Sequence, residues 1–137
     1  MSKPKIVVGR TDHNKLTRLA NGLLDKRPEV AEELLAELER ASVLDDQDVP
    51  PQTVQMDSTV EYRTDGTSAA RSVTLVYPGD ADIAEGKISI LTPIGTALLG
   101  LSVGQTIDFI ANDGRKLVLS VLSISHAQHR ALSPAVG

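Results

Sequence analysis

The stretch Ile88–Ile107, ISILTPIGTALLGLSVGQTI, is the most informative about the fold of this chain, because it joins two β-branched runs through a short apolar segment. Thr92 is a predicted N-cap, and Pro93 suits the first helical position, where its missing N–H would have no helical partner. Gly100 is a typical residue for ending a helix. The stretch therefore predicts a strand, a short helix and a second strand.

One face of this short helix is apolar, since Ile94, Ala97 and Leu98 recur at helical spacing. Gly95 lies inside the helix, where glycine costs about 1 kcal/mol relative to alanine. We therefore expect another part of the chain to approach the backbone of Gly95 closely. A sheet beneath the apolar face is the simplest source of that contact.

Composition indicates a globular protein with one modest core: the 137 residues are 41% hydrophobic and 23% charged. The absence of cysteine excludes disulfides and thiolate zinc sites. The net charge of −4 argues against a general nucleic-acid binder, so we expect no direct sequence-specific nucleic-acid binding. The polar start resembles no secretion signal, and no apolar run approaches the roughly 20 residues of a membrane span. We therefore expect a cytoplasmic protein without membrane contact.

Two short amphipathic helices are predicted before residue 45. Thr11 and Asp12 supply N-cap side chains for the first helix, and Pro28 suits the first turn of the second. The stripes on the two helices predict an antiparallel hairpin about 20 Å long. Such stripes can also meet a second copy of the chain, so a weak homodimer is a further expectation. The apolar stripes are Leu16, Leu19, Ala20 and Leu23 on the first helix and Ala31, Leu34, Leu38 and Ala41 on the second.

Beyond an acidic, proline-rich segment the hydrophobic period changes to two, which is typical of strands. We predict an α+β fold: a helical hairpin in residues 1–44, a linker in 45–52, and a mostly antiparallel sheet of four to five strands with one short helix in 53–137. The composition of the linker leaves the angle of the hairpin open. The predicted strands are Val54–Arg63, Arg71–Tyr77, Ile88–Ile90, Ile107–Ile110 and Leu117–Ile124, with a turn at Asn112–Gly114.

Few residues point to catalysis. No nucleophile elbow and no cysteine nucleophile is present, so we expect no enzyme, no catalytic residue and no cofactor. His126 and His129 stand at helical spacing without a further ligand, so we expect solvated side chains and no metal site. Tyr62, Tyr77 and Phe109 are the only aromatic residues, and we expect them to serve as core or edge packing and not as the lining of a pocket.

The segment Lys87–Gly100, followed by Val103-Gly104, resembles the C-terminal domain of the Gre transcript-cleavage factors. The turn at Asn112–Gly114 falls where that domain has its last hairpin. The whole chain is more similar to the Rnk family, the regulators of nucleoside diphosphate kinase, in which a short helical hairpin precedes this domain. The Rnk-like stretches are Pro4–Val8, Thr74–Pro78 and Pro93–Leu101.

The resemblance implies an FKBP-like β domain that docks on bacterial RNA polymerase at the rim of the secondary channel, with the hairpin pointing into the channel. The family's docking loop maps onto Leu91, Thr92, Pro93 and Ile94. Leu91 departs from the Gre pattern, in which a polar or acidic residue is usual, and is Rnk-like. The implied function is a non-catalytic transcription regulator that competes with Gre factors and affects nucleoside diphosphate kinase indirectly.

The predicted hairpin tip consists of Asp25, Lys26, Arg27 and Glu29. In Gre factors a longer coiled coil carries an acidic tip that helps to hold a catalytic magnesium ion. Asp25 and Glu29 offer carboxylates, but the hairpin is short, and Lys26 and Arg27 repel a cation. The interpretation as a Gre-like cleavage stimulator is therefore the alternative, and a binding module for another protein, such as nucleoside diphosphate kinase, is a third hypothesis.

Overall fold

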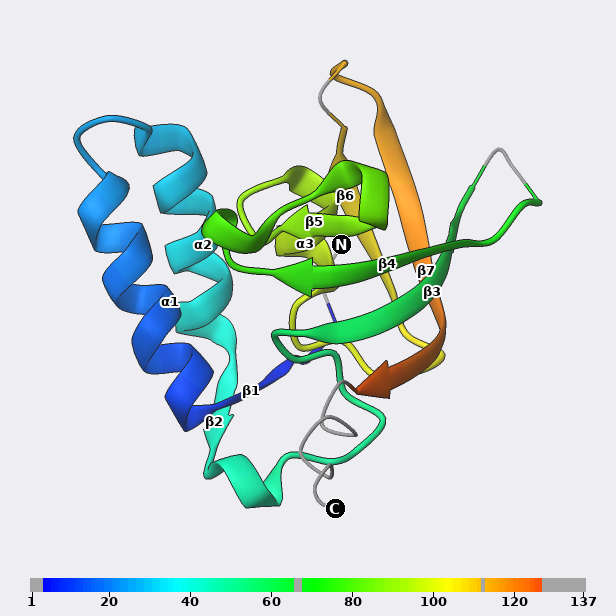
Figure 1. Ribbon diagram of the computed structural model, residues 1–137, viewed down its shortest axis with the longest axis horizontal. Helices are drawn as coiled ribbons and strands as arrows, with labels where there is room; N and C mark the ends of the chain where they lie inside the picture. The colour runs from blue at the N-terminus through cyan, green and yellow to red at the C-terminus, as the bar shows by residue number, and fades with distance from the viewer. Residues whose placement is uncertain (1–3, 66–67, 112, 127–137) are drawn as a thin grey trace.

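A helical hairpin and a curled five-stranded sheet are the main parts of the computed structural model, which describes residues 4–65, 68–111 and 113–126 (Figure 1). The hairpin consists of α1 (Arg10–Leu23) and α2 (Pro28–Arg40). Short strands β1 (Val7–Gly9) and β2 (Ser42–Leu44) flank it and pair in parallel. The predicted antiparallel hairpin is thus confirmed.

The sheet has the strand order β5-β4-β3-β7-β6, so β5 and β6 are its two edges. Neighbouring strands are antiparallel except for β4 and β5, which are parallel. The predicted α+β fold class, the number of strands and the single short helix are therefore confirmed. The elements are β3 (Ser58–Thr64), β4 (Arg71–Val76), β5 (Lys87–Ser89), α3 (Pro93–Leu98), β6 (Thr106–Ile110) and β7 (Lys116–His126), with 3-10 turns η1 (Asp46–Asp48), η2 (Pro78–Asp80) and η3 (Ile83–Glu85).

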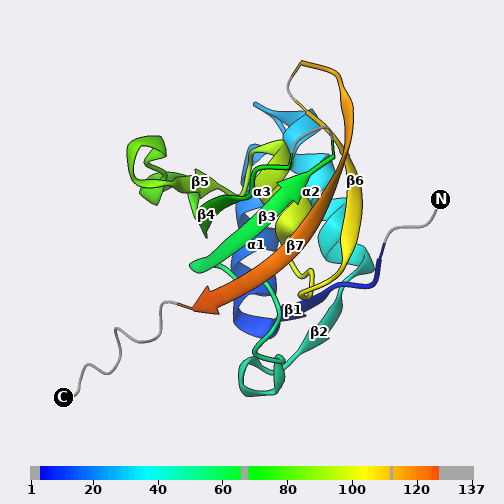
Figure 2. The same cartoon turned by 90° about the vertical axis from the view of Figure 1, so that its right-hand side faces the viewer.

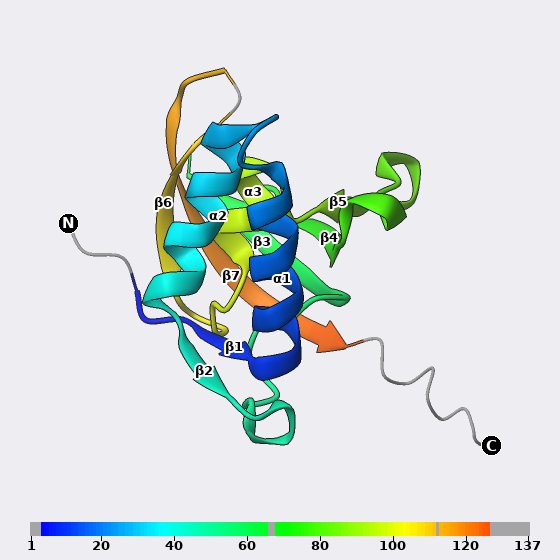
Figure 3. The same ribbon diagram turned by 90° about the vertical axis from the view of Figure 1, so that its left-hand side faces the viewer.

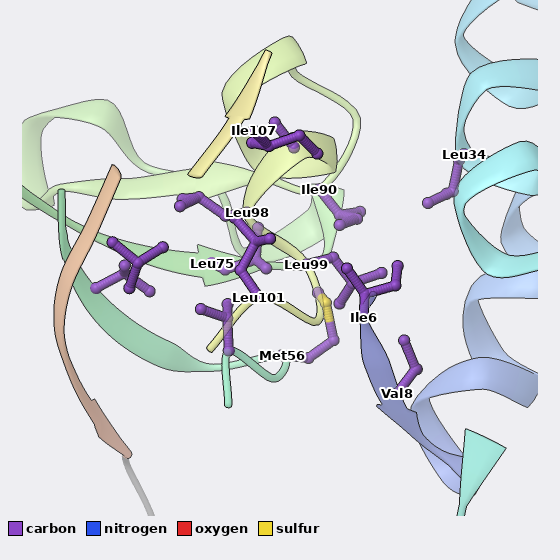
Figure 4. Close-up of a cluster of buried hydrophobic side chains, with 14 of the residues drawn as sticks. Ile6, Val8, Leu34, Met56, Leu75, Ile90, Leu98, Leu99, Leu101 and Ile107 are labelled. Carbon is purple, nitrogen blue, oxygen red and sulfur yellow. The ribbon is translucent and has the colours of Figure 1, made fainter. Parts of the chain in front are cut away.

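One hydrophobic cluster joins the hairpin to the sheet. Leu34 points from α2 toward the side chains around Ile6, Ile90 and Leu99 (Figure 4). The apolar stripes of α1 and α2 therefore meet the sheet as well as each other, and Figure 3 shows both helices in front of α3 and the strands. A weak homodimer stays a prediction, but the stripes that suggested it are covered by the chain itself. The buried members of these stripes are Leu16, Ala20, Ala31, Leu34 and Leu38.

The segment before α1 is fitted against the end of α3. The N–H of Val7 donates to the carbonyl of Gly100 at 3.1 Å. Gly100 has a φ of 81°, and an added Cβ there would lie 2.7 Å from the Cβ of Ile6. Only glycine combines this left-handed conformation with the close approach of Ile6. Gly100 therefore ends the short helix, as predicted, and also makes room for the N-terminal segment.

The predicted N-cap of α1 is wrong. The helix begins at Arg10, and its N-cap residue Gly9 has no side chain to offer. The carboxylate of Asp46 takes this role from 35 residues away: it accepts hydrogen bonds from the N–H of Thr11, at 3.0 Å, and from the Thr11 hydroxyl. These bonds lower the pKa of Asp46. Part of the predicted linker is thereby attached to the first helix.

Asp12, the other predicted cap, instead connects α1 to the sheet. Its carboxylate accepts hydrogen bonds from the N–H of Met56 and from the hydroxyl of Tyr77, both at 3.3 Å. Burial raises the pKa of Asp12, and nearby Asp46 and Asp57 act in the same direction, although the two hydrogen bonds oppose the shift. The hairpin angle that the linker composition left open is set by these contacts and by the shared core.

Two other predictions concern the end of the chain. His126 ends β7 with both ring nitrogens in contact: Nδ1 lies 2.9 Å from the Ser58 hydroxyl, and Nε2 lies 2.7 Å from the carbonyl of Pro51. The prediction of a solvated side chain is therefore wrong for His126. His129 and the rest of 127–137 lie outside the described residues, as do residues 66–67 and residue 112 of the predicted turn at Asn112–Gly114.

Candidate functional site

Hydrogen bonds fix the loop that leads into α3. The Thr92 hydroxyl accepts from the N–H of Gly95 at 3.0 Å and donates to the carbonyl of Ser89 at 2.8 Å. The Thr96 hydroxyl donates to the carbonyl of Ile90 at 2.7 Å. Thr92 is thus the N-cap and Pro93 the first residue of the helix, as predicted.

Gly95 makes the close contact that the sequence predicts. A Cβ added there would lie 2.3 Å from the carbonyl oxygen of Ser89 and 3.1 Å from the Cα of Ile90. Both atoms belong to the backbone at the end of β5, so α3 rests directly on the edge of the sheet. The loop between β5 and α3 is consequently held from both sides.

The four predicted docking residues are half-buried, and three hollows in the surface meet at the loop that they form. Leu91 and Ile94 pack against the edge of the hydrophobic core. Thr92 lies in two of the hollows, and Pro93 lies in all three. The first hollow runs across the sheet, the second faces the hairpin tip, and the third lies between α2, α3 and β6. The loop therefore presents a ridge between concave surfaces.

The first hollow is a groove of about 660 Å³ beside Pro93 and Ile94. Its lining includes Tyr62 and Phe109, which are 4% and 8% exposed. The prediction that the aromatic residues serve as core packing holds for both rings, but the prediction that they line no pocket is wrong. Strand alternation places Tyr62 and Phe109 on the same face of the sheet, a signal that could have indicated this groove.

Charged side chains stand along the rim of the groove, and sequence reasoning missed them. Asp65 and Arg71 come from the ends of β3 and β4, and Asp113 and Arg115 precede β7. Arg115 Nε donates to Asp113 Oδ2 at 2.7 Å. Hydrogen bonds from the backbone and side chain of Arg115 lower the pKa of Asp113. Burial raises the pKa of Tyr62 on the groove floor, and the charge of Arg71 opposes that shift. The groove thus combines an apolar floor with charges of both signs.

The second hollow, of about 220 Å³, lies between one end of the hairpin and the predicted docking loop. Arg27, the residue before α2, lines it together with Leu91, Thr92 and Pro93. Asp25, Lys26 and Glu29 are exposed and are not part of its lining. Of the four predicted tip residues, the structure therefore places one beside the predicted docking loop.

Within 4–65, 68–111 and 113–126, no three His, Cys, Asp or Glu side chains gather where they could hold a metal ion. Among the helices of these same ranges, none has the length and apolar character that crossing a membrane requires.

Two family models match consecutive parts of the chain. The Rnk N-terminus matches residues 4–44, and the C-terminal domain of the transcription elongation factors GreA/GreB matches residues 49–126. The second match contains Leu91–Ile94, the groove and all five strands of the main sheet.

Individual relatives agree with these matches. The regulator of nucleoside diphosphate kinase of Escherichia coli (strain K12) is 31% identical over 131 residues, which cover 96% of each chain. Transcription elongation factor GreA of Flavobacterium johnsoniae is 33% identical over 106 residues, 77% of this chain and 65% of that protein. The solved structure of a prokaryotic transcription elongation factor GreA/GreB from Nitrosomonas europaea is 39% identical, with a TM-score of 0.72 over 90% of this chain and 100% of that chain. The chain therefore belongs to the GreA/GreB family of transcription factors, with an Rnk-type N-terminus ahead of the family's C-terminal domain.

Proposed function

We propose that this protein is a non-catalytic, cytoplasmic transcription regulator that binds RNA polymerase near the secondary channel and competes there with Gre factors. Leu91–Ile94 and the adjoining groove form the contact surface. One observation carries the proposal: Arg27 of the hairpin tip and Leu91–Pro93 line the same hollow. A protein docked through this loop keeps its hairpin tip beside the docking site.

The length of the hairpin supports a blocking role over a catalytic one. α1 has 14 residues and α2 has 13, so each spans about 20 Å at the α-helical rise. Because Arg27 at the tip lines the same hollow as the docking loop, the hairpin does not extend far beyond the docked domain. Lys26 and Arg27 also place positive charge beside Asp25 and Glu29, which opposes the binding of a magnesium ion. In this proposal the hairpin (1–44), the linker (45–52) and the sheet domain (53–137) act as one docked unit.

The groove supplies what a protein contact needs. Its half-buried apolar lining, which includes Pro93, Ile94 and Leu117, offers apolar contact area, and its rim charges favour one orientation of the partner. The Escherichia coli relative is named for an effect on nucleoside diphosphate kinase. We infer that such an effect in this protein is indirect and acts through transcription.

Binding of the purified protein to core RNA polymerase tests the proposal. We expect co-sedimentation at micromolar concentration, and a double variant Pro93→Ala with Ile94→Glu should bind at least tenfold more weakly. Val103→Glu is the matched control, because Val103 is an exposed aliphatic residue outside the three hollows. Circular dichroism should show that both variants keep the folded sheet. Absence of binding by the wild-type protein would refute the proposal.

A transcript-cleavage assay on a stalled elongation complex separates the proposed regulator from a cleavage stimulator. We expect no stimulation by this protein and inhibition of an added Gre factor. If cleavage were stimulated, and if Asp25→Asn with Glu29→Gln abolished the stimulation, the alternative function would replace the one proposed.

A further inference from the structure

The segment 78–86 between β4 and β5, which we call the projection, stands clear of the sheet (Figures 2 and 3). It carries Ile83, which is 84% exposed, whereas Ile110 and Val103, the next most exposed large aliphatic residues in the described ranges, are 52% and 38% exposed. Isoleucine is among the residues most often buried in proteins. A single exposed aliphatic side chain is nevertheless ordinary, so the surroundings of Ile83 must decide whether it has a role.

Backbone hydrogen bonds hold the projection in one conformation. Asp82 and Lys87 exchange two bonds, each from the N–H of one to the carbonyl of the other at 2.9 Å. Within the loop that this pair closes, the N–H of Gly86 donates to the carbonyl of Ile83 at 3.0 Å. At its other end, the N–H of Asp80 donates to the carbonyl of Tyr77 at 2.9 Å. A contact residue on such a preorganised loop loses little conformational entropy on binding.

The surroundings of Ile83 are acidic. The projection contains Asp80, Asp82 and Glu85, all exposed, and no lysine or arginine. The nearest cation along the chain, Lys87, lies 3.6 Å from the carboxylate of Glu85. An exposed aliphatic side chain among carboxylates is complementary to an apolar recess with basic side chains around it.

The projection and the docking loop lie at the two ends of the same short strand. β5 has three residues, Lys87–Ser89, and spans about 10 Å at the usual rise of a strand. The projection ends where β5 begins, and Leu91 follows shortly after its end. Because β5 is an edge strand of the sheet, a partner bound at the docking loop can also reach Ile83.

We propose that Ile83 is a second contact with RNA polymerase, inserted into an apolar recess that lysine or arginine side chains border on the polymerase surface. This inference rests on the proposed function, since the polymerase is the partner that it assigns. The hydrogen-bonded backbone of the projection positions Ile83. The carboxylates of the projection orient the protein as it approaches the polymerase. The protein then binds along the whole β5 edge, with the docking loop at one end and Ile83 at the other.

The test measures the Kd of core RNA polymerase for wild type, Ile83→Glu and Val103→Glu by fluorescence anisotropy. Both variants replace an exposed aliphatic residue by glutamate, and only Ile83 lies on the projection. We expect Ile83→Glu to weaken binding at least fivefold and Val103→Glu to leave it within twofold. The double variant Asp80→Asn with Asp82→Asn should reduce the dependence of Kd on salt concentration. Equal urea midpoints for wild type and variants confirm that folding is unchanged.

The outcomes separate the two proposals. If wild type binds and Ile83→Glu binds equally well, the second contact is refuted and the proposed function stands. If wild type does not bind the polymerase, the proposed function is refuted, and the second contact is refuted with it. Weaker binding of Ile83→Glu and Val103→Glu alike would show a nonspecific effect of added negative charge and would also refute the second contact.

Discussion

Replacing Gly95 by alanine should destabilise this protein, although alanine is the better helix former. The added Cβ would lie 2.3 Å from the carbonyl oxygen of Ser89 and 3.1 Å from the Cα of Ile90. These are backbone atoms and cannot rotate away as the end of a side chain can. The first turn of α3 must therefore move away from β5 by roughly 1 Å to restore an ordinary contact distance.

The expected loss of stability combines one stabilising contribution with two destabilising ones. Alanine in place of glycine favours a helix by about 1 kcal/mol. Overpacking at a rigid contact costs about 1–3 kcal/mol. The displacement also breaks the hydrogen bonds from Thr92 to Ser89 and from Thr96 to Ile90, at 2.8 and 2.7 Å, which contribute about 1 kcal/mol each. We expect a net loss of about 2–4 kcal/mol in the free energy of unfolding.

Urea unfolding measures this loss, and Gly22→Ala is its matched control. Gly22 lies in α1, and an added Cβ there has nothing within 4 Å, so the same substitution should stabilise the protein by about 0.5–1 kcal/mol. The two variants should therefore shift the midpoint in opposite directions. If Gly95→Ala were as stable as wild type or more stable, the close approach of α3 and β5 would not be the constraint described. A displaced α3 should also weaken polymerase binding, because α3 begins in the proposed docking loop.

Two further predictions concern the junction of the hairpin and the sheet. Burial raises the pKa of Asp12 above its value in the unfolded chain, which is about 3.9. Between these two pKa values the folded chain binds more protons than the unfolded chain, so the stability of the folded state falls as the pH rises. Asp12→Asn should therefore gain stability relative to wild type between pH 4 and pH 7 in urea unfolding, and parallel curves would contradict this reasoning. Leu34→Ala should cost about 2–5 kcal/mol, because the side chain is 0% exposed between the hairpin and the sheet. In urea unfolding of this variant, the circular-dichroism signal of the helices and the fluorescence of the tyrosines should change in the same transition. Two separate transitions would show that the hairpin and the sheet do not share one core.

Local patterns in the sequence were enough to predict most elements of this fold. The Thr92-Pro93 pair predicts the start of α3, and the alternation of apolar residues predicts the strands. The position of Gly95 predicts a close backbone contact before any partner is known. These predictions succeeded because each rests on interactions between residues a few positions apart, which the backbone geometry of helices and strands determines.

The candidate site was only partly predictable. Leu91–Ile94 could be named from the resemblance to Gre factors, but the groove beside them is made by Tyr62 and Phe109 from different strands. Arg27 could be assigned to the hairpin tip, but its place beside Pro93 depends on how the hairpin packs. The exposure of a side chain likewise depends on tertiary structure. The sequence shows only an apolar residue next to a turn at position 83, and this pattern does not predict that Ile83 is exposed.

Residue patterns alone predict the two hairpin helices, the short helix, the strands of the main sheet and the order of these elements. The angle between the hairpin and the sheet, and therefore which residues share a surface, is a property of the packed chain. This angle depends on contacts between distant residues, such as Asp46 with Thr11 and Asp12 with Met56 and Tyr77. A carboxylate side chain can accept hydrogen bonds from many donors along a chain, and the packing of the whole chain determines which donors it meets.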